Sequence, residues 1–247
     1  MDGVKIPSIF CRIYLQNEKN GARLHMELDK TNPRRRRDMK DYKELSRQEF
    51  NREAAKFDNA SVTDVYSLCK NSYEPILKEV KKETFETLLD VGCGTGNSIE
   101  RLCMDLPDKK YVGIDLAEKM VEIAQKKEIK NSKFVVGDAE KLPFSDNQFD
   151  VIICKESFHH YPNVENFFKS AYRVLKPGGR LIILDMTCPA PLRWLYNHVL
   201  LKCMNKGDVH VYNMREMETL YTDAGFSLEK KCREKEFRFV TVGRKVA

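Results

Sequence analysis

Three kinds of pattern are absent from this chain of 247 residues, and each absence excludes a class of protein. No apolar run approaches the roughly 18 residues needed to cross a bilayer, so we expect no membrane span. The first residues show no signal-peptide pattern of charge, apolar stretch and small-residue cleavage site. The eight cysteines include no C-x-x-C pair, and several fall in expected core elements. We therefore expect a cytoplasmic protein with reduced thiols.

Positive charge is concentrated near the start of the chain. The net charge is +6, yet residues 1–38 hold nine Lys or Arg against five Asp or Glu, centred on four arginines at 34–37. Such a run can contact phosphates, but a solvated tail is the more common outcome. We interpret residues 1–38 as a basic, poorly ordered extension and do not expect a nucleic-acid partner.

Apolar strands and helical segments alternate through the rest of the chain. Near-continuous apolar strands separated by helices are typical of a parallel sheet that is covered on both faces. The expected strands are 86–91, 110–115, 133–138, 149–154, 180–185, 226–233 and 236–243, and the expected helices lie near 97–105, 117–128 and 164–175. Helical spacing also predicts a cap at 39–82, and the domain at 83–247 carries a helical insert at about 188–224. Pro177-Gly178-Gly179 is expected to break the chain before the fifth strand.

The most informative segment is LLDVGCGTG at residues 88–96, an apolar strand that runs into glycines at alternate positions. Because glycine has no Cβ, a backbone with Gly92, Gly94 and Gly96 can turn sharply and approach a ligand closely. The helix expected next points its N-terminal amides into the same space. Asp115 ends the following strand, YVGID, where a carboxylate can accept two hydrogen bonds from ribose hydroxyls.

The spacing of the glycines separates two classes of nucleotide site. A dinucleotide site has the pattern G-x-G-x-x-G, whose third glycine would fall at Asn97, so a nicotinamide oxidoreductase is disfavoured. Asp90, Gly92, Gly94 and Gly96 instead match D/E-x-G-x-G-x-G position for position. With this motif the chain resembles the class I S-adenosylmethionine-dependent methyltransferases.

Four segments extend the resemblance over about residues 40–247: DVGCGTG, GIDLAEKM, GDAEKLPF and LKPGGRLIILD. They resemble the branch that includes the ubiquinone and menaquinone biosynthesis methyltransferases. The resemblance implies an α/β fold, with a Rossmann-like seven-stranded, mostly parallel sheet, helices on both faces and a C-terminal reversed hairpin. It also implies S-adenosyl-L-methionine as cofactor. The cofactor-binding residues implied in this way are Asp90, Gly92, Gly94, Gly96, Asp115, Leu116, Asp138, Ala139 and Lys155.

Two of these positions have a more specific expectation. The family pattern implies that Asp138 accepts a hydrogen bond from the adenine amino group, while Ala139 offers its backbone amide to the ring. The alternative is that Asp138 only caps a short turn. Lys155 and Glu156, in the segment after the fourth strand, are the nearest candidates for contact with the methionine portion.

That same segment, ICKESFHHYPN, faces the methyl acceptor in the family resembled. His159 and His160 are tentative catalytic residues, since a neutral imidazole can remove a proton from a hydroxyl or amine. Either one can equally hold a loop by a hydrogen bond, and we expect adjacent side chains to point apart, so that both do not serve together. The candidates for lining the acceptor pocket are Phe57, Tyr66, Tyr73, Trp194 and Tyr212, with core packing as the alternative for each.

These observations predict a methyltransferase that moves a methyl group from S-adenosylmethionine to a small molecule by direct in-line transfer. One alternative is an RNA or protein methyltransferase, although the D/N-P-P-Y element of amino-group methylases is replaced here by KESFHHYPN. Another is a cofactor-binding regulatory subunit without turnover. Asp185 ends the fifth strand, but without a second and third oxygen ligand we predict no metal.

Overall fold

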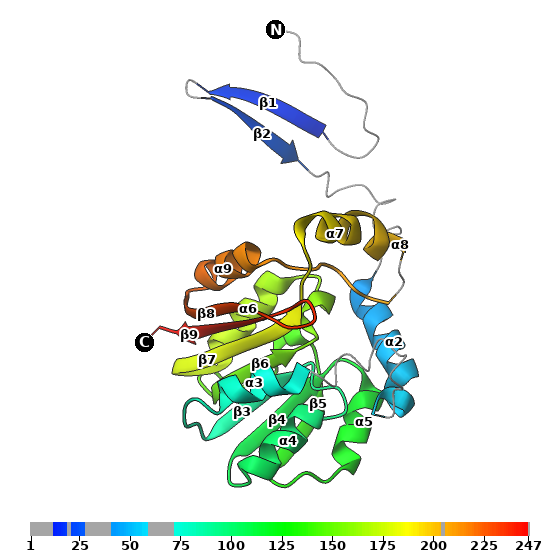
Figure 1. The fold of residues 1–247 in the computed structure, drawn as a ribbon, viewed down its shortest axis with the longest axis vertical. Helices are drawn as coiled ribbons and strands as arrows, with labels where there is room; N and C mark the ends of the chain where they lie inside the picture. The colour runs from blue at the N-terminus through cyan, green and yellow to red at the C-terminus, as the bar shows by residue number, and fades with distance from the viewer. Residues whose placement is uncertain (1–11, 19–20, 28–40, 59–71, 204–205, 247) are drawn as a thin grey trace. The chain divides into compact units, whose positions relative to one another are not determined.

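The structure is a computed structural model that describes residues 12–18, 21–27, 41–58, 72–203 and 206–246. The chain divides into two compact units, Met1–Lys40 and Asp41–Ala247 (Figure 1). In the first unit, strands β1 (Arg12–Glu18) and β2 (Gly21–Glu27) pair antiparallel. These two strands were not predicted from the sequence, and the poor order of residues 1–38 stays a prediction.

The second unit is built on one seven-stranded sheet in the order β5-β4-β3-β6-β7-β9-β8. Its strands are β3 (Thr87–Val91), β4 (Lys110–Asp115), β5 (Ser132–Val136), β6 (Phe149–Lys155), β7 (Leu175–Met186), β8 (Phe226–Glu234) and β9 (Arg238–Lys245). Strand β9 alone runs against its neighbours, because it pairs antiparallel with both β7 and β8. The predicted Rossmann-like sheet with a reversed C-terminal hairpin is therefore confirmed.

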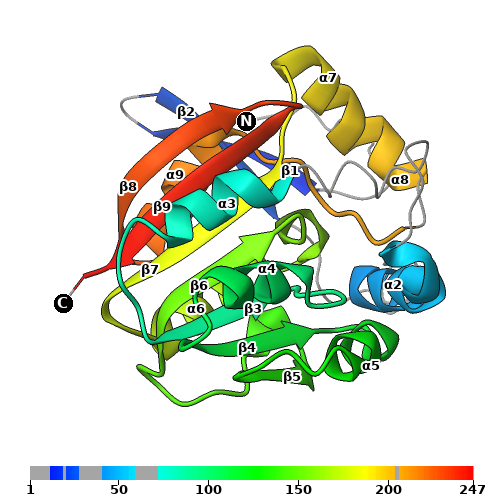
Figure 2. The ribbon, with the colours of Figure 1, turned by 60° about the horizontal axis from the view of Figure 1, so that its bottom comes forward.

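Helices cover both faces of this sheet, as Figure 2 shows from a second direction. The helices before and between the strands are α2 (Tyr42–Phe57), α3 (Tyr73–Val80), α4 (Asn97–Asp105), α5 (Glu118–Lys126), α6 (Val164–Val174) and α9 (Met214–Asp223). Apolar side chains of α3, α4 and α5 share one buried cluster, and those of α6 and α9 share another. Helix α2 packs on α5, where Phe50 and Ala54 meet Met120. The amphipathic spacing in the sequence thus buries one face of each helix.

Strand β7 begins earlier than the sequence predicted. Leu175 already pairs with Phe149, and the ladder resumes at Arg180, which pairs with Val151. The Pro-Gly-Gly segment is therefore an irregularity within the strand, where Gly178 has a φ of +77°. The strand extends because Leu175 is fully buried in the core, and this burial outweighs the turn preference of the residues that follow.

The late insert is helical but irregular. It consists of α7 (Ala190–Leu195), a π-helical turn η4 (Tyr196–Leu200) and α8 (Leu201–Cys203). A loop then leads to α9, whose start is fixed by a capping box between Asn213 and Glu216. Among the residues that the structure describes, every helix is too short or too polar to cross a membrane.

Candidate functional site

A cavity of about 460 Å³ lies beyond the carboxyl ends of β3, β4 and β6. Its lining includes Gly92 just after β3, Asp115 at the end of β4 and Lys155 at the end of β6. The chain order of the sheet reverses here, because β4 and β5 lie on one side of β3 and β6 lies on the other. In open α/β sheets, such a switch point is where ligands bind, and small-molecule pockets measure about 300–1,000 Å³.

The glycine turn after β3 is shaped by close contacts that no side chain would allow. A Cβ added to Gly92, which has a φ of +73°, would lie 2.0 Å from Oγ of Ser157. A Cβ on Gly96 would lie 2.9 Å from the ring of Phe134. Gly94 differs, since the nearest atom to its added Cβ would be 3.9 Å away. Gly92 and Gly94 line the cavity, whereas Gly96 packs the start of α4 against the core.

The carboxylate of Asp115 lies beside this turn and organises it. Its Oδ2 accepts a hydrogen bond from the Gly94 amide at 2.8 Å, and its Oδ1 accepts one from the Ala117 amide at 2.8 Å. Burial raises the pKa of Asp115, and these amide hydrogen bonds oppose the rise. Because an ionised carboxylate has about four acceptor positions, acceptor capacity remains for a ligand. Leu116 lines the cavity next to it.

Asp90 lies inside the sheet and does not line the cavity. Its side chain is 1% exposed, and among the described residues neither carboxylate oxygen has a hydrogen bond of normal geometry. Burial raises the pKa of Asp90 to about 7; the charge of Lys155 opposes this rise and that of Asp115 adds to it. Asp90 therefore lies in β3 directly before the glycine turn and supports it from inside the sheet. With this pKa, its carboxyl group is partly protonated at neutral pH.

Asp138 and Ala139 both line the cavity after β5. Asp138 caps the short 3₁₀ helix η2 (Ala139–Lys141) by accepting from the Glu140 amide at 2.9 Å. Its other oxygen accepts from Nζ of Lys43 at 2.7 Å, which ties α2 to the site. The capping alternative thus describes one real contact of Asp138, and the predicted adenine contact stays a prediction.

The end of β6 carries an ion pair and a left-handed residue. Lys155 lines the cavity, and its Nζ lies 4.1 Å from the centre of the Tyr73 ring and 3.2 Å from Oγ of Ser72. Glu156 adopts a φ of +51°, and its carboxylate accepts a hydrogen bond from Nε of the buried Arg238. Positive φ at a residue with a side chain is strained, so this pair holds the strand end in a costly conformation.

His159 is fixed by a buried carboxylate at the end of β7. Its Nδ1 lies 2.6 Å from Oδ1 of Asp185, and its backbone amide donates to Oδ2 at 3.1 Å. Burial lowers the pKa of His159, but the charge and hydrogen bond of Asp185 outweigh this effect and raise the pKa to about 9. The ring is then protonated at neutral pH, so the structure supports the loop-holding alternative for His159 more than a base role.

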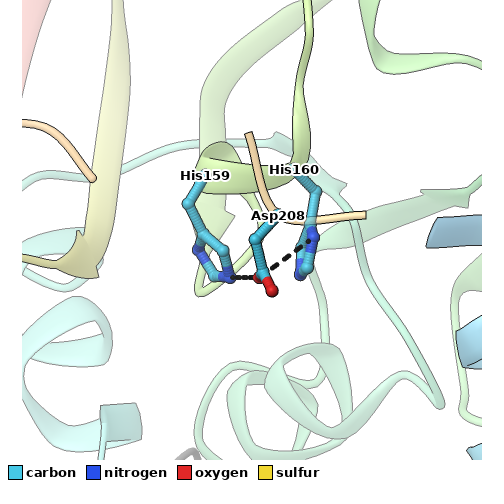
Figure 3. Close-up of side chains that lie close together, drawn as sticks. All are labelled: His159, His160 and Asp208. Carbon is cyan, nitrogen blue, oxygen red and sulfur yellow. Dashed lines mark ion pairs between the residues drawn. The ribbon is translucent and has the colours of Figure 1, made fainter. Parts of the chain in front are cut away.

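His160 lies beside His159 in the 3₁₀ turn η3 (Phe158–His160), and the two ring centres are 4.1 Å apart. Burial and the charge of His159 lower the pKa of His160 to about 4, so its ring is neutral. Figure 3 shows the Asp208 carboxylate between the two rings. Our expectation that the adjacent side chains point apart was wrong, because both rings turn toward this carboxylate.

The predicted acceptor-pocket residues fall into three groups. Phe57 and Tyr73 line the cavity. Trp194 does not; its side chain is 60% exposed and stacks on His198. Tyr212 does not line it either, since its ring packs 4.8 Å from Phe158 in the core. Tyr66 lies outside the described residues.

The chain is similar to known methyltransferases. A family profile described as a methyltransferase domain matches residues 89–183. The chain is 30% identical over 172 residues to the demethylmenaquinone methyltransferase of Thermotoga maritima, an alignment that covers 66% of this chain and 75% of that protein. The chain belongs to the class I S-adenosylmethionine-dependent methyltransferases.

Two further relatives of this methyltransferase agree with that assignment. The chain is 34% identical over 150 residues to the 27-O-demethylrifamycin SV methyltransferase of Amycolatopsis mediterranei. This alignment covers 58% of this chain and 55% of that protein. The crystal structure of an S-adenosylmethionine-dependent methyltransferase from Aquifex aeolicus matches with a TM-score of 0.61 at 26% identity, covering 78% of this chain and 98% of that one. S-adenosylmethionine is accordingly the cofactor of this family member.

The methyltransferase's own residues fit that cofactor on two observations. The open side of Gly94 allows a ligand to approach the backbone within the cavity. Asp115 keeps unused acceptor positions beside it, as ribose hydroxyls require.

Sequence reasoning missed several residues that the fold brings to the cavity. They are Lys43 and Phe50 from α2, Asp208 from the loop after α8, and Arg238 from the start of β9. Lys43, Asp208 and Arg238 lie in segments without a motif. Helical spacing could have flagged Phe50, but nothing local marks Asp208, which approaches His159 only through tertiary packing.

Proposed function

We propose that this methyltransferase acts on a small-molecule acceptor that binds in the same cavity as the cofactor. The observation that carries the proposal is the composition of that one cavity. It joins the glycine turn and Asp115 to an apolar and aromatic compartment that also contains His159 and His160. A volume of about 460 Å³ suits small ligands.

On this proposal, the cofactor lies against the residues at the carboxyl ends of β3, β4 and β5. The backbone at Gly92 and Gly94 approaches it, Asp115 accepts from its ribose hydroxyls, and Leu116 packs beside the sugar. Asp138 and Ala139 take the adenine, and Lys155 lies beside the methionine portion. When bound, S-adenosylmethionine supplies an electrophilic methyl group. Asp90 and Gly96 support these contacts from behind without lining the cavity.

The acceptor compartment is aromatic on one side and polar on the other. The ring of Phe50 lies 6.5 Å from that of Phe57 and 5.0 Å from that of His160, so the three rings form one surface. His159 and His160 are our candidates for contact with the acceptor. In-line transfer asks mainly for alignment of the acceptor atom with the methyl carbon, which can contribute up to about 7–11 kcal/mol. The relatives from Thermotoga maritima and Amycolatopsis mediterranei each carry a small molecule in their names, which supports an acceptor of this kind.

The test is to supply the full-length protein with methyl-labelled S-adenosylmethionine and a cell extract divided by size. We expect a labelled product in the fraction of small molecules, which mass spectrometry would identify by the mass of one added methyl group. Asp115→Asn should lower the yield, while the surface variant Asp146→Asn should not, because Asp146 is 69% exposed, pairs with Arg173 and does not line the cavity.

The rival functions predict different results in the same experiment. Label that appears only in RNA or protein would replace the small-molecule proposal with a macromolecular acceptor. Binding of the cofactor without labelled product in any fraction would support a regulatory subunit that does not turn over.

A further inference from the structure

Two imidazoles and one carboxylate converge at the edge of the cavity in an arrangement that the methyl-transfer reaction does not explain. Nε2 of His159 and Nδ1 of His160 each lie 3.5 Å from Oδ1 of Asp208 (Figure 3). One candidate ligand atom from each residue lies within 4.8 Å of the other two. All three residues line the cavity.

The distances in this cluster are too long for good hydrogen bonds. A charge-assisted hydrogen bond between nitrogen and oxygen measures about 2.7–2.9 Å, well below the 3.5 Å seen here. In addition, Nδ1 of His160 has no hydrogen-bond partner among residues 41–58, 72–203 and 206–246. The nitrogen is also buried, since the His160 side chain is only 10% exposed. A buried ring nitrogen without a partner is costly, and a ligand at this point would remove that cost.

The same distances suit a metal ion with tetrahedral coordination. For ligand bonds of about 2.0–2.1 Å, two ligand atoms at the tetrahedral angle are separated by about 3.4 Å, and octahedral neighbours by only about 3.0 Å. The two separations between a histidine nitrogen and Oδ1 of Asp208, both 3.5 Å, are close to the tetrahedral value. Two nitrogens with one carboxylate suit zinc, while magnesium and calcium prefer oxygen ligands.

The surrounding residues orient the first ligand as metal sites require. Asp185 is 1% exposed and accepts from Nδ1 of His159 at 2.6 Å. This contact directs the other nitrogen, Nε2, toward Asp208. A carboxylate behind a metal-binding histidine fixes the ring and raises its basicity, and it is common in zinc sites.

The loop that carries the carboxylate is also fixed in place. The Val209 amide donates to the backbone oxygen of His159 at 2.8 Å, which joins the loop to η3 next to the cluster. Gly207 has a φ of +83°, and a Cβ there would lie 2.5 Å from the Ser46 backbone nitrogen. The three groups are therefore held in position by the fold itself.

We propose that His159, His160 and Asp208 bind one Zn²⁺ ion, which displaces the proton from Nε2 of His159 to solvent and has its remaining coordination position toward the cavity. This departs from the expectation of no metal, which considered only oxygen ligands around Asp185. Zinc binding here goes beyond the proposed function, because it does not depend on which acceptor is methylated. Asp185 is a positioning residue for the site, since it acts through His159.

The test is a calorimetric titration of the chelator-treated, full-length protein with Zn²⁺. We expect one ion per chain to bind with an affinity that falls roughly 10–100-fold in Asp185→Asn. The decrease should be greater in His160→Ala and in Asp208→Asn, which each remove a ligand. The matched control is His198→Ala, because His198 is an exposed histidine that stacks on Trp194 away from the cluster. Binding of S-adenosylhomocysteine to each variant shows that it is folded.

A second measurement does not depend on the folding of any variant. With Co²⁺ in place of Zn²⁺, a four-coordinate nitrogen and oxygen site gives strong visible absorption without a thiolate charge-transfer band. No zinc binding by the wild type, unchanged affinity in both ligand variants, an equal loss in His198→Ala, or a thiolate band from cysteine ligands would each overturn the proposal.

Discussion

Replacing Asp90 by asparagine should change how the stability of this methyltransferase depends on pH. Asp90 is 1% exposed, and its pKa is about 7 in the folded protein, compared with an ordinary value of 3.8. The folded state therefore holds this proton more tightly than the unfolded state does. Between about pH 4 and pH 7 the wild type loses stability through this group as the pH rises, and below pH 4 the penalty is absent.

The size of the effect follows from the difference between the two pKa values. About three pH units at 1.36 kcal/mol each give a loss of about 4 kcal/mol in the free energy of unfolding. Asp150 and Glu79 have lowered pKa values, so their contributions to the stability of the protein decrease as the pH falls. This dependence on pH is opposite to that of Asp90. Their contributions are the same in both proteins and cancel in the difference between variant and wild type.

The assay is urea unfolding of the wild type and Asp90→Asn at several pH values from 4 to 8. We expect the stability of the variant to increase relative to the wild type as the pH rises, with a total change of a few kcal/mol. An asparagine amide that lacks a partner adds a constant offset, which does not alter this trend. A difference that stays flat across the range would refute the argument that burial raises the pKa of Asp90.

Further predictions concern the glycine turn and the ion pair at the end of β6. Gly92→Ala should cost about 1–3 kcal/mol of unfolding free energy and weaken cofactor binding, because its Cβ would lie 2.0 Å from Oγ of Ser157. The control Gly178→Ala has a similar φ of +77° and nothing within 4 Å, so an equal loss in both would rule out the clash as the cause. Arg238→Gln should cost about 3–5 kcal/mol in urea unfolding, since Glu156 and Arg238 have side chains 9% and 7% exposed and the carboxylate would be left uncompensated. Adding Glu156→Gln should recover part of that loss, and no recovery would contradict the pairing.

The sheet and the cofactor turn could be predicted from the sequence because both depend on local patterns. The apolar runs marked the strands, and the helix predicted at 97–105 coincides with α4. The early start of β7 was missed because it depends on the burial of Leu175 against other elements of the fold. The turn residues beside Leu175 do not determine where this strand begins. The alternation of strands and helices specifies topology well, but strand ends depend on packing.

The acceptor side was less predictable because its residues come together only through tertiary structure. His159 was found because it follows a strand, yet its partners Asp185 and Asp208 are 26 and 49 positions further along the chain. Trp194 was expected in the pocket as an aromatic residue of the insert, but its side chain is on the outside of α7. Helical spacing alone did not reveal which face of the insert turns inward.

The most direct test of the central claim is calorimetry with S-adenosylhomocysteine on the wild type and on Asp115→Asn. If the cavity beside the glycine turn holds the cofactor through this carboxylate, the wild type should bind one molecule per chain, and the variant should bind about 5- to 150-fold more weakly, which corresponds to about 1–3 kcal/mol. Asp146→Asn should match the wild type. Equal affinity in Asp115→Asn, or no binding heat in the wild type, would contradict the account.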